Sequence, residues 1–222
     1  MKIKGVSTKS KTHGLTLIEM LVVLVVVIIL LVLFLPSAPH ERRYAAVICI
    51  NNLKEVDLGL TMYADDNNGK FPFQISVTND GTMELIYSNH VFPHYEKASH
   101  ALVDPRILVC PFDTTRHAAT NFETLNDSNI SYFLNADAKR DSSTNTILAG
   151  DRFLQNNGQS LKSGLFFLTT NLNMSWTADT HNGGGNLALS DGSVVQTKNG
   201  GVLSLSSFIK EQPLATNRLL IP

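Results

Sequence analysis

The pattern of apolar and polar positions begins with an almost uniformly apolar stretch over residues 15–35, in which Glu19 is the one charged residue. A run of this length can cross a bilayer as a helix. The apolar core of a secretory signal peptide would be shorter and would end at a small-residue cleavage site, which the proline-containing sequence after Leu35 does not offer. We therefore predict a transmembrane helix over residues 15–35.

A second helical pattern follows. Apolar residues recur at intervals of three and four and define one face of an amphipathic helix: Ala46, Cys49, Leu53, Val56, Leu60 and Tyr63. Charged residues such as Lys54, Glu55 and Asp57 occupy the other positions and are predicted to face solvent. The turn-forming residues 65–69 should end this helix. Residues 36–68 are thus expected to continue the first helix, with a bend near Pro36.

Shorter patterns fill residues 69–222 and predict one globular domain. Two short helices are expected, at Met83–Tyr87 and Tyr95–Leu102, and Leu203–Ile209 is either a last helix or a strand. Apolar runs predict strands at Arg106–Cys110, Ile130–Leu134, Thr146–Ala149 and Gly164–Thr169. The fold class expected is α+β, with the long N-terminal helix packed on a small antiparallel sheet.

The strongest β signal is a predicted hairpin over residues 186–196. Asp191-Gly192 suits a two-residue turn that requires positive φ angles. In that register Leu187 and Leu189 would face the same side of the sheet as Val194.

Charge is distributed unevenly along the chain. The net charge is −1, but four lysines and no acidic residue precede Gly14, so the remainder is more acidic than the whole. A nucleic-acid partner is not expected, because phosphate binding requires a basic surface. The lysines before an apolar helix also favour a cytoplasmic N-terminus.

The sequence Gly14-Leu15-Thr16-Leu17-Ile18-Glu19 and the apolar run after it resemble the N-terminal segment of type IV pilins and of the pseudopilins of type II secretion systems. The resemblance implies that a prepilin peptidase removes residues 1–14 as a leader and methylates the new N-terminus at Leu15. It also implies that Glu19 pairs with the α-amino group of a neighbouring subunit during assembly. Pilin-like helices often carry a proline at the position of Pro36.

Downstream strings extend the resemblance. The sequence Asn52-Leu53-Lys54 and the segment Tyr63–Pro72 resemble the helix end and following turn of the major pseudopilin type. The sequences Cys110-Pro111-Phe112-Asp113 and Ile130-Ser131-Tyr132-Phe133 are similar to a large set of planctomycete and verrucomicrobial prepilin-like proteins. Those proteins carry a histidine followed, after nine residues, by Asp-Gly. Here the element is His181 with Asp191-Gly192.

Candidate chemistry outside the N-terminus is sparse. Cys49 and Cys110 form either a disulfide or two buried thiols, since their spacing matches no redox or zinc motif. Oxygen ligands for calcium could come from Asp151, Asp179 and Asp191, while the alternative is that His181 packs a glycine-rich loop and Asp191 makes a turn. No other cofactor is expected.

Catalysis is not expected either. Ser190, His181 and Asp191 are close in sequence, but no Gly-x-Ser-x-Gly nucleophile elbow occurs. Cys110 and His117 could pair, but Pro111 and the surrounding loop indicate a structural role. We interpret the chain as a structural, non-enzymatic subunit of a pseudopilus. Its expected partners are prepilin peptidase, identical or related pilin-like subunits, an inner-membrane assembly platform and the lipid bilayer.

The expected location is the inner membrane, crossed once, with the C-terminal domain in the periplasm until a filament assembles. Two alternatives stay open. One is a type IV pilus subunit for adhesion or DNA uptake, and the other is a membrane-anchored binding protein that keeps residues 1–14.

Overall fold

The computed structural model describes residues 14, 16–34, 39–140, 146–178, 181–213 and 216–222. The chain divides into two compact units, Met1–His40 and Glu41–Pro222. The amphipathic stretch after residue 40 therefore belongs to the same compact unit as the C-terminal region.

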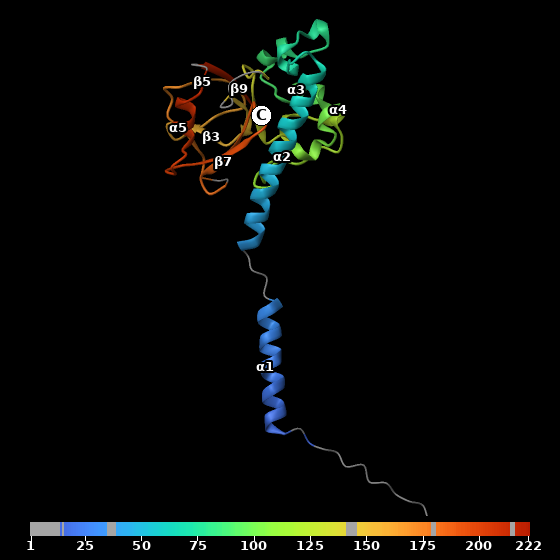
Figure 1. Ribbon diagram of the computed structural model, residues 1–222, viewed down its shortest axis with the longest axis vertical. Helices are drawn as coiled ribbons and strands as arrows, with labels where there is room; N and C mark the ends of the chain where they lie inside the picture. Colours follow the sequence, from blue (N-terminus) through green and yellow to red (C-terminus); the bar gives the residue numbers. More distant parts are fainter. Residues whose placement is uncertain (1–13, 15, 35–38, 141–145, 179–180, 214–215) are drawn as a thin grey trace, which may run out of the picture. The chain divides into compact units, whose positions relative to one another are not determined.

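Helix α1 (Leu17–Phe34) is the described helix of the first unit (Figure 1). Its large apolar side chains from Leu17 to Leu33 are exposed on every side. No helix among the described residues is long and apolar enough to cross a membrane. The transmembrane helix over residues 15–35 and the bend at Pro36 stay predictions, and residues 15 and 35–38 lie outside the described part of the chain.

Helix α2 (Pro39–Asp66) confirms the predicted amphipathic helix. Proline suits its first position, where the backbone N–H has no partner within the helix. The predicted apolar face is buried, with Cys49, Leu53, Val56 and Leu60 fully inaccessible to solvent. The helix lies between the β-rich part of the unit and helix α4 (Figure 1). The closeness of α4 is shown by Leu102, which occupies the space beside Gly59.

Asp57 departs from the predicted solvent-facing side of this helix. Only 2% of its surface is exposed. Gly192, far along the chain, covers it, because a Cβ added at Gly192 would lie 3.4 Å from Asp57 Oδ2. The helical period correctly puts Asp57 next to the apolar face, but it cannot show that a distant turn covers that edge.

Short helices fill the chain between α2 and the first strand. They are η1 (Pro72–Gln74), η2 (Val77–Asn79), η3 (Met83–Ser88), α3 (Phe92–Lys97), α4 (Ser99–Leu102), η4 (Pro105–Leu108), η5 (Phe122–Thr124) and η6 (Asp127–Asn129). The helix predicted at Met83–Tyr87 corresponds to the 3₁₀ helix η3. The segment predicted as one helix at Tyr95–Leu102 is divided into α3 and α4 at Ala98. The strand predicted at Arg106–Cys110 is wrong, because Asp104 accepts the N–H of Arg106 and caps a 3₁₀ helix that begins with proline.

Two antiparallel sheets follow. The larger has the strand order β5-β9-β1-β2-β7-β8 and the smaller has the order β4-β3-β6. The strands are β1 (Tyr132–Asn135), β2 (Ile147–Asp151), β3 (Leu154–Asn156), β4 (Gln159–Ser160), β5 (Gly164–Thr169), β6 (Met174–Trp176), β7 (Gly184–Leu189), β8 (Val194–Lys198) and β9 (Thr216–Ile221). The α+β class is thereby confirmed.

Each face of the larger sheet carries its own hydrophobic core. On β1, Tyr132 and Leu134 join a cluster with the buried face of α2. Phe133, between them, joins a second cluster with Trp176 of the smaller sheet and with helix α5 (Leu205–Lys210). This alternation is the period of two that a pleated strand imposes on its side chains. The segment Leu203–Ile209, left open between helix and strand, is mainly helical.

The hairpin between β7 and β8 exists, but its predicted register is wrong by one residue. Ala188 pairs with Val194, and Leu187 pairs with Val195. The cause is a three-residue loop, since Leu189 donates its N–H to the Ser193 carbonyl. Gly192 takes a left-handed φ of 88° in that loop. A shift of one residue reverses the face of every side chain, so Leu187 lies opposite to Val194.

Candidate functional site

The N-terminal motif is built around a helix cap. Thr16 donates its N–H to Glu19 Oε2 at 2.7 Å and its hydroxyl to the same oxygen at 2.8 Å. The Glu19 N–H in turn reaches Thr16 Oγ1 at 3.4 Å. This reciprocal pattern is a capping box, which satisfies backbone donors that a helix N-terminus leaves without partners. Glu19 therefore has a local structural role in the uncleaved chain.

The predicted cleavage position lies just before this cap. Gly14 is exposed, and a Cβ added to it would meet nothing within 4 Å. Leu15, the predicted site of methylation, lies outside the described residues. The role of Thr16 was missed from the sequence, although the spacing Thr-x-x-Glu before an apolar run is a recognised signal for a capping box.

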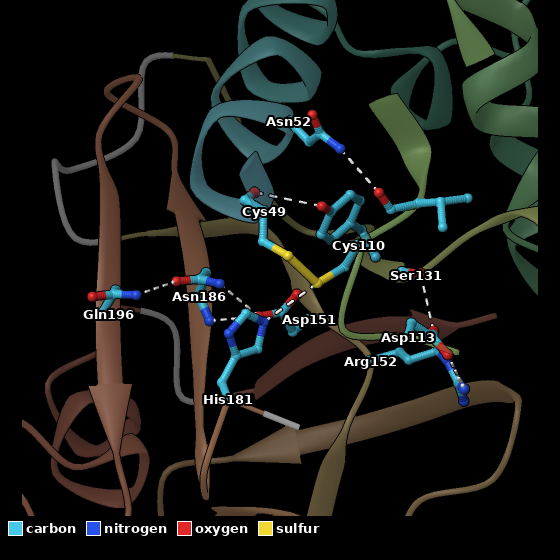
Figure 2. The surroundings of a disulfide bond; sticks show 12 residues. Cys49, Asn52, Cys110, Asp113, Ser131, Asp151, Arg152, His181, Asn186 and Gln196 are labelled. Carbon is cyan, nitrogen blue, oxygen red and sulfur yellow. Dashed lines mark hydrogen bonds and ion pairs between the residues drawn. A yellow bond between two sulfur atoms is a disulfide. The ribbon is translucent and has the colours of Figure 1, made fainter. Parts of the chain in front are cut away.

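In the second unit, Cys49 and Cys110 form a disulfide with a Cα–Cα distance of 5.0 Å (Figure 2). This decides between the two states that the sequence left open. The bond joins α2 to the chain that follows η4, and both residues are fully buried. Asn52 ties the same two regions by donating to the Val109 carbonyl at 2.9 Å, and the Tyr132 hydroxyl on β1 donates to the Cys49 carbonyl.

His181 lies directly against this disulfide (Figure 2). Its Nε2 is 3.3 Å from Cys110 Sγ and 3.4 Å from Asp151 Oδ2. The ring of Phe112 packs on the imidazole with centroids 4.4 Å apart. Burial lowers the pKa of His181, so the neutral imidazole is favoured.

Asp151 is the buried acid of this cluster. Its Oδ2 accepts the backbone N–H of Asn186 at 2.8 Å and the Asn186 side-chain amide at 2.9 Å. Gln196 in turn donates to the Asn186 side-chain oxygen. Burial raises the pKa of Asp151 to about 7, against the two hydrogen bonds from Asn186 that favour the charged form. Its other oxygen, Oδ1, has no hydrogen-bond partner among the described residues.

A second buried acid, Asp113, ends the Cys110–Asp113 motif, but no site role was predicted for it from the sequence. Arg152 binds it through two hydrogen bonds, of 2.7 Å and 3.0 Å, and Ser131 donates to it at 3.0 Å. Burial raises the pKa of Asp113, but the hydrogen bonds from Arg152, Thr115 and Ser131 outweigh that effect and the pKa is lowered. No sequence signal links Asp113 with Arg152, since the pairing depends on tertiary structure.

The structure does not bring the elements of the predicted His-x9-Asp-Gly motif together. His181 precedes β7, while Asp191 follows it and accepts hydrogen bonds from Ser193 in the β7–β8 turn. Asp151 lies beside Asn186, near the start of β7. The five residues from Asn186 to Asp191 correspond to roughly 16 Å of extended strand, far more than one calcium ion can bridge.

Asp151 and Asp191 are therefore too far apart to share one calcium ion. Asp179, the third residue of the predicted calcium site, lies outside the described residues. The possible catalytic sets are not assembled either. Ser190 and Asp191 lie at the far end of β7 from His181, Cys110 is oxidised, and His117 is exposed. The expectation that Asp191 makes a turn is confirmed. The His181 side chain packs on Phe112 and the disulfide, and Gly184 and Gly185 belong to β7.

One of the comparisons with known proteins found a match. Residues 9–35 match a family model described as the prokaryotic N-terminal methylation motif. No curated protein and no solved structure matches the chain. The matched segment contains Gly14, Thr16 and Glu19, whose geometry is given above. The chain carries the prepilin-type N-terminal methylation motif of type IV pilin-like proteins.

Proposed function

We propose that the chain is the precursor of a structural, pilin-like subunit. A prepilin peptidase cuts between Gly14 and Leu15 and methylates Leu15, and the subunit then joins a pseudopilus of a type II secretion-like system. The observation that carries this proposal is the motif match over residues 9–35. The antiparallel α+β unit after residue 40 fits a pilin-like head domain.

The surface of α1 supports assembly. Its large side chains are apolar around the whole helix, and those from Leu17 to Leu33 are exposed. A helix that is apolar on all sides requires apolar surroundings. Lipid would provide them before assembly, and the α1 helices of other subunits would provide them in the filament.

Glu19 supports the same proposal through its charge. In the precursor its carboxylate is bound by Thr16. Cleavage after Gly14 creates a positively charged α-amino group at Leu15. An unpaired charge in apolar surroundings costs several kcal/mol, so a filament is stabilised when the amine of one subunit meets Glu19 of its neighbour. This pairing would also fix the axial register of the subunits.

The disulfide is consistent with the proposed topology. Disulfides persist outside the reducing cytoplasm, and the Cys49–Cys110 bond belongs to the C-terminal unit. The lysine-rich leader would stay in the cytoplasm, where the peptidase and the assembly platform act. A type IV pilus subunit would share all these features, and long surface fibres in place of a short pseudopilus would assign the chain to that class.

The role of Glu19 can be separated from its cap in one experiment. Glu19→Gln retains an oxygen that accepts the Thr16 hydrogen bonds but removes the charge. Thr16→Val removes the hydroxyl from the cap but leaves the charge. With the peptidase and assembly machinery present, we expect Glu19→Gln to be inserted into the membrane and cleaved but not assembled, whereas Thr16→Val assembles. Normal filaments from Glu19→Gln would contradict the proposal.

A further inference from the structure

The disulfide and His181 bring three metal-binding atoms to one point. The two sulfur atoms of Cys49 and Cys110 and one imidazole nitrogen of His181 all lie within 4.8 Å of one another. In a tetrahedral zinc site, Zn–S bonds of about 2.3 Å and Zn–N bonds of about 2.0 Å place the ligand atoms roughly 3.5–3.8 Å apart. The 3.3 Å between Cys110 Sγ and His181 Nε2 is already close to that separation.

The orientation of the imidazole indicates ligation and does not fit a proton relay. In a Cys-His-Asp relay, one ring nitrogen faces the sulfur and the other faces the carboxylate. Here the same atom, His181 Nε2, faces both Cys110 Sγ and Asp151 Oδ2. Donor atoms that converge on a shared space are the arrangement that a metal ion requires.

The imidazole is also fixed in place and shielded. The side chain of His181 is 6% exposed, and the ring of Phe112 packs against it. The backbone of His181 adopts a positive φ of 47°, followed by positive φ values at Asn182 and Gly183. This tight turn directs the histidine back toward α2 immediately before β7 begins, so little rearrangement is needed for the nitrogen to act as a ligand.

We propose that Cys49, Cys110 and His181 form a zinc site when the disulfide is reduced. A dithiol reductant transfers two electrons and two protons to the bond, giving two thiols in the protein and a disulfide in the reductant. Zinc then binds the two sulfur atoms and His181 Nε2 and displaces the two thiol protons. The metal replaces the covalent link between α2 and the chain after η4, so the same three residues join these regions in both redox states.

Asp151 is a buried carboxylate beside this set, although it is not among the ligand atoms that all lie within 4.8 Å of one another. Its Oδ2 lies 3.4 Å from His181 Nε2, and its Oδ1 is buried without a hydrogen-bond partner among the described residues. A buried carboxylate oxygen without a donor is costly, and a nearby cation or a metal-bound water would satisfy it.

The test uses the full chain in detergent. The protein is reduced with a phosphine, freed of the reductant without oxygen, and titrated with Zn²⁺ or Co²⁺. We expect one zinc per reduced chain, none retained by the oxidised chain, and with cobalt a thiolate-to-metal charge-transfer band. His181→Asn should weaken binding by more than about 100-fold, because loss of an outer-shell partner alone costs 10–100-fold. The matched control is His117→Asn, at an exposed histidine, which should bind as the parent does.

The fold of each variant is checked in its oxidised state, where no metal is needed. Oxidised His181→Asn with a parental circular dichroism spectrum shows that any loss of binding is local. The proposal is overturned if the reduced chain retains no zinc, or if reduced His181→Asn binds zinc as tightly as the parent. Neither result depends on processing by the peptidase or on filament assembly.

Discussion

Asp57 of α2 lies beneath Gly192 of the β7–β8 turn, with Asp57 Oδ2 3.4 Å from the position that a Cβ at Gly192 would occupy. Burial raises the pKa of Asp57 to about 7, the nearby Asp191 adds to the increase, and Arg140 opposes it. Asp57 Oδ1 has no hydrogen-bond partner among the described residues. The contact between helix and hairpin therefore favours the protonated acid.

This contact predicts a pH dependence of stability. From about pH 4 to pH 7, Asp57 is ionised in the unfolded chain but protonated in the folded one, so the folded state binds more protons and its stability falls as the pH rises. Asp57→Asn should remove this loss, raising the free energy of unfolding by up to about 4 kcal/mol above pH 7 and leaving it unchanged near pH 4. Urea unfolding at several pH values measures the difference.

The control for this series is Asp66→Asn, at an exposed position on the same helix. Asp151 titrates over the same range in both the parent and the variant, so only the difference between the two chains is interpreted. A difference that does not change with pH would contradict the assignment to Asp57.

The buried pair of Asp113 and Arg152 predicts a large effect of a single substitution. Arg152→Met leaves the Asp113 carboxylate buried without its charged partner, which should destabilise the fold by about 3–5 kcal/mol. Replacing both residues, as Asp113→Asn with Arg152→Met, should recover part of that loss. Thermal unfolding of the parent, the two single variants Asp113→Asn and Arg152→Met, and the double variant gives the coupling between the residues. A loss below about 1 kcal/mol for Arg152→Met would show that the pair is not tightly coupled.

The disulfide predicts a measurable stabilisation. It closes a loop with a sequence separation of 61, and the chain-entropy relation gives a contribution on the order of 4 kcal/mol. Replacing both cysteines by serine should reduce the free energy of unfolding by about this amount in the presence of a chelator. The reduced parent, also with chelator, provides the comparison without a change of sequence. Equal stability of oxidised and reduced parent would contradict this prediction.

Trp176 predicts that position 185 must stay without a side chain. A Cβ at Gly185 would lie 2.6 Å from the indole ring, which is fully buried and donates to Thr197 at 2.7 Å. Gly185→Ala should therefore cost about 1–3 kcal/mol through overpacking. Gly201→Ala, at an exposed position where only milder contacts arise, should be close to neutral, and tryptophan fluorescence during unfolding reports both variants.

The amphipathic helix α2 and the strands β1, β2, β5, β7 and β8 could be predicted because each depends on a local period. The strands β3, β4, β6 and β9 and most of the 3₁₀ helices were not predicted. The face of α2 from Cys49 to Tyr63 and the strand Gly164–Thr169 follow from such patterns. The hairpin register could not be predicted, because Asp191-Gly192 suits loops of two and of three residues and the choice reverses the faces of Leu187 and Val194. Local signals thus locate elements but not their alignment.

The candidate site also combines residues that could be predicted from the sequence with contacts that could not. Gly14 and Glu19 form a contiguous motif and could be identified from the sequence. His181 was singled out with Asp191, yet its contacts are Cys110 and Asp151. That environment depends on how β2, β7 and the disulfide meet, which spacing along the chain does not encode.

The central claim is that the chain is processed as a prepilin, and the intact mass of the protein from native host membranes tests it most directly. The account predicts a chain that has lost residues 1–14 and gained the mass of one methyl group at Leu15. An uncut chain, or one cleaved beyond residue 35, would contradict it.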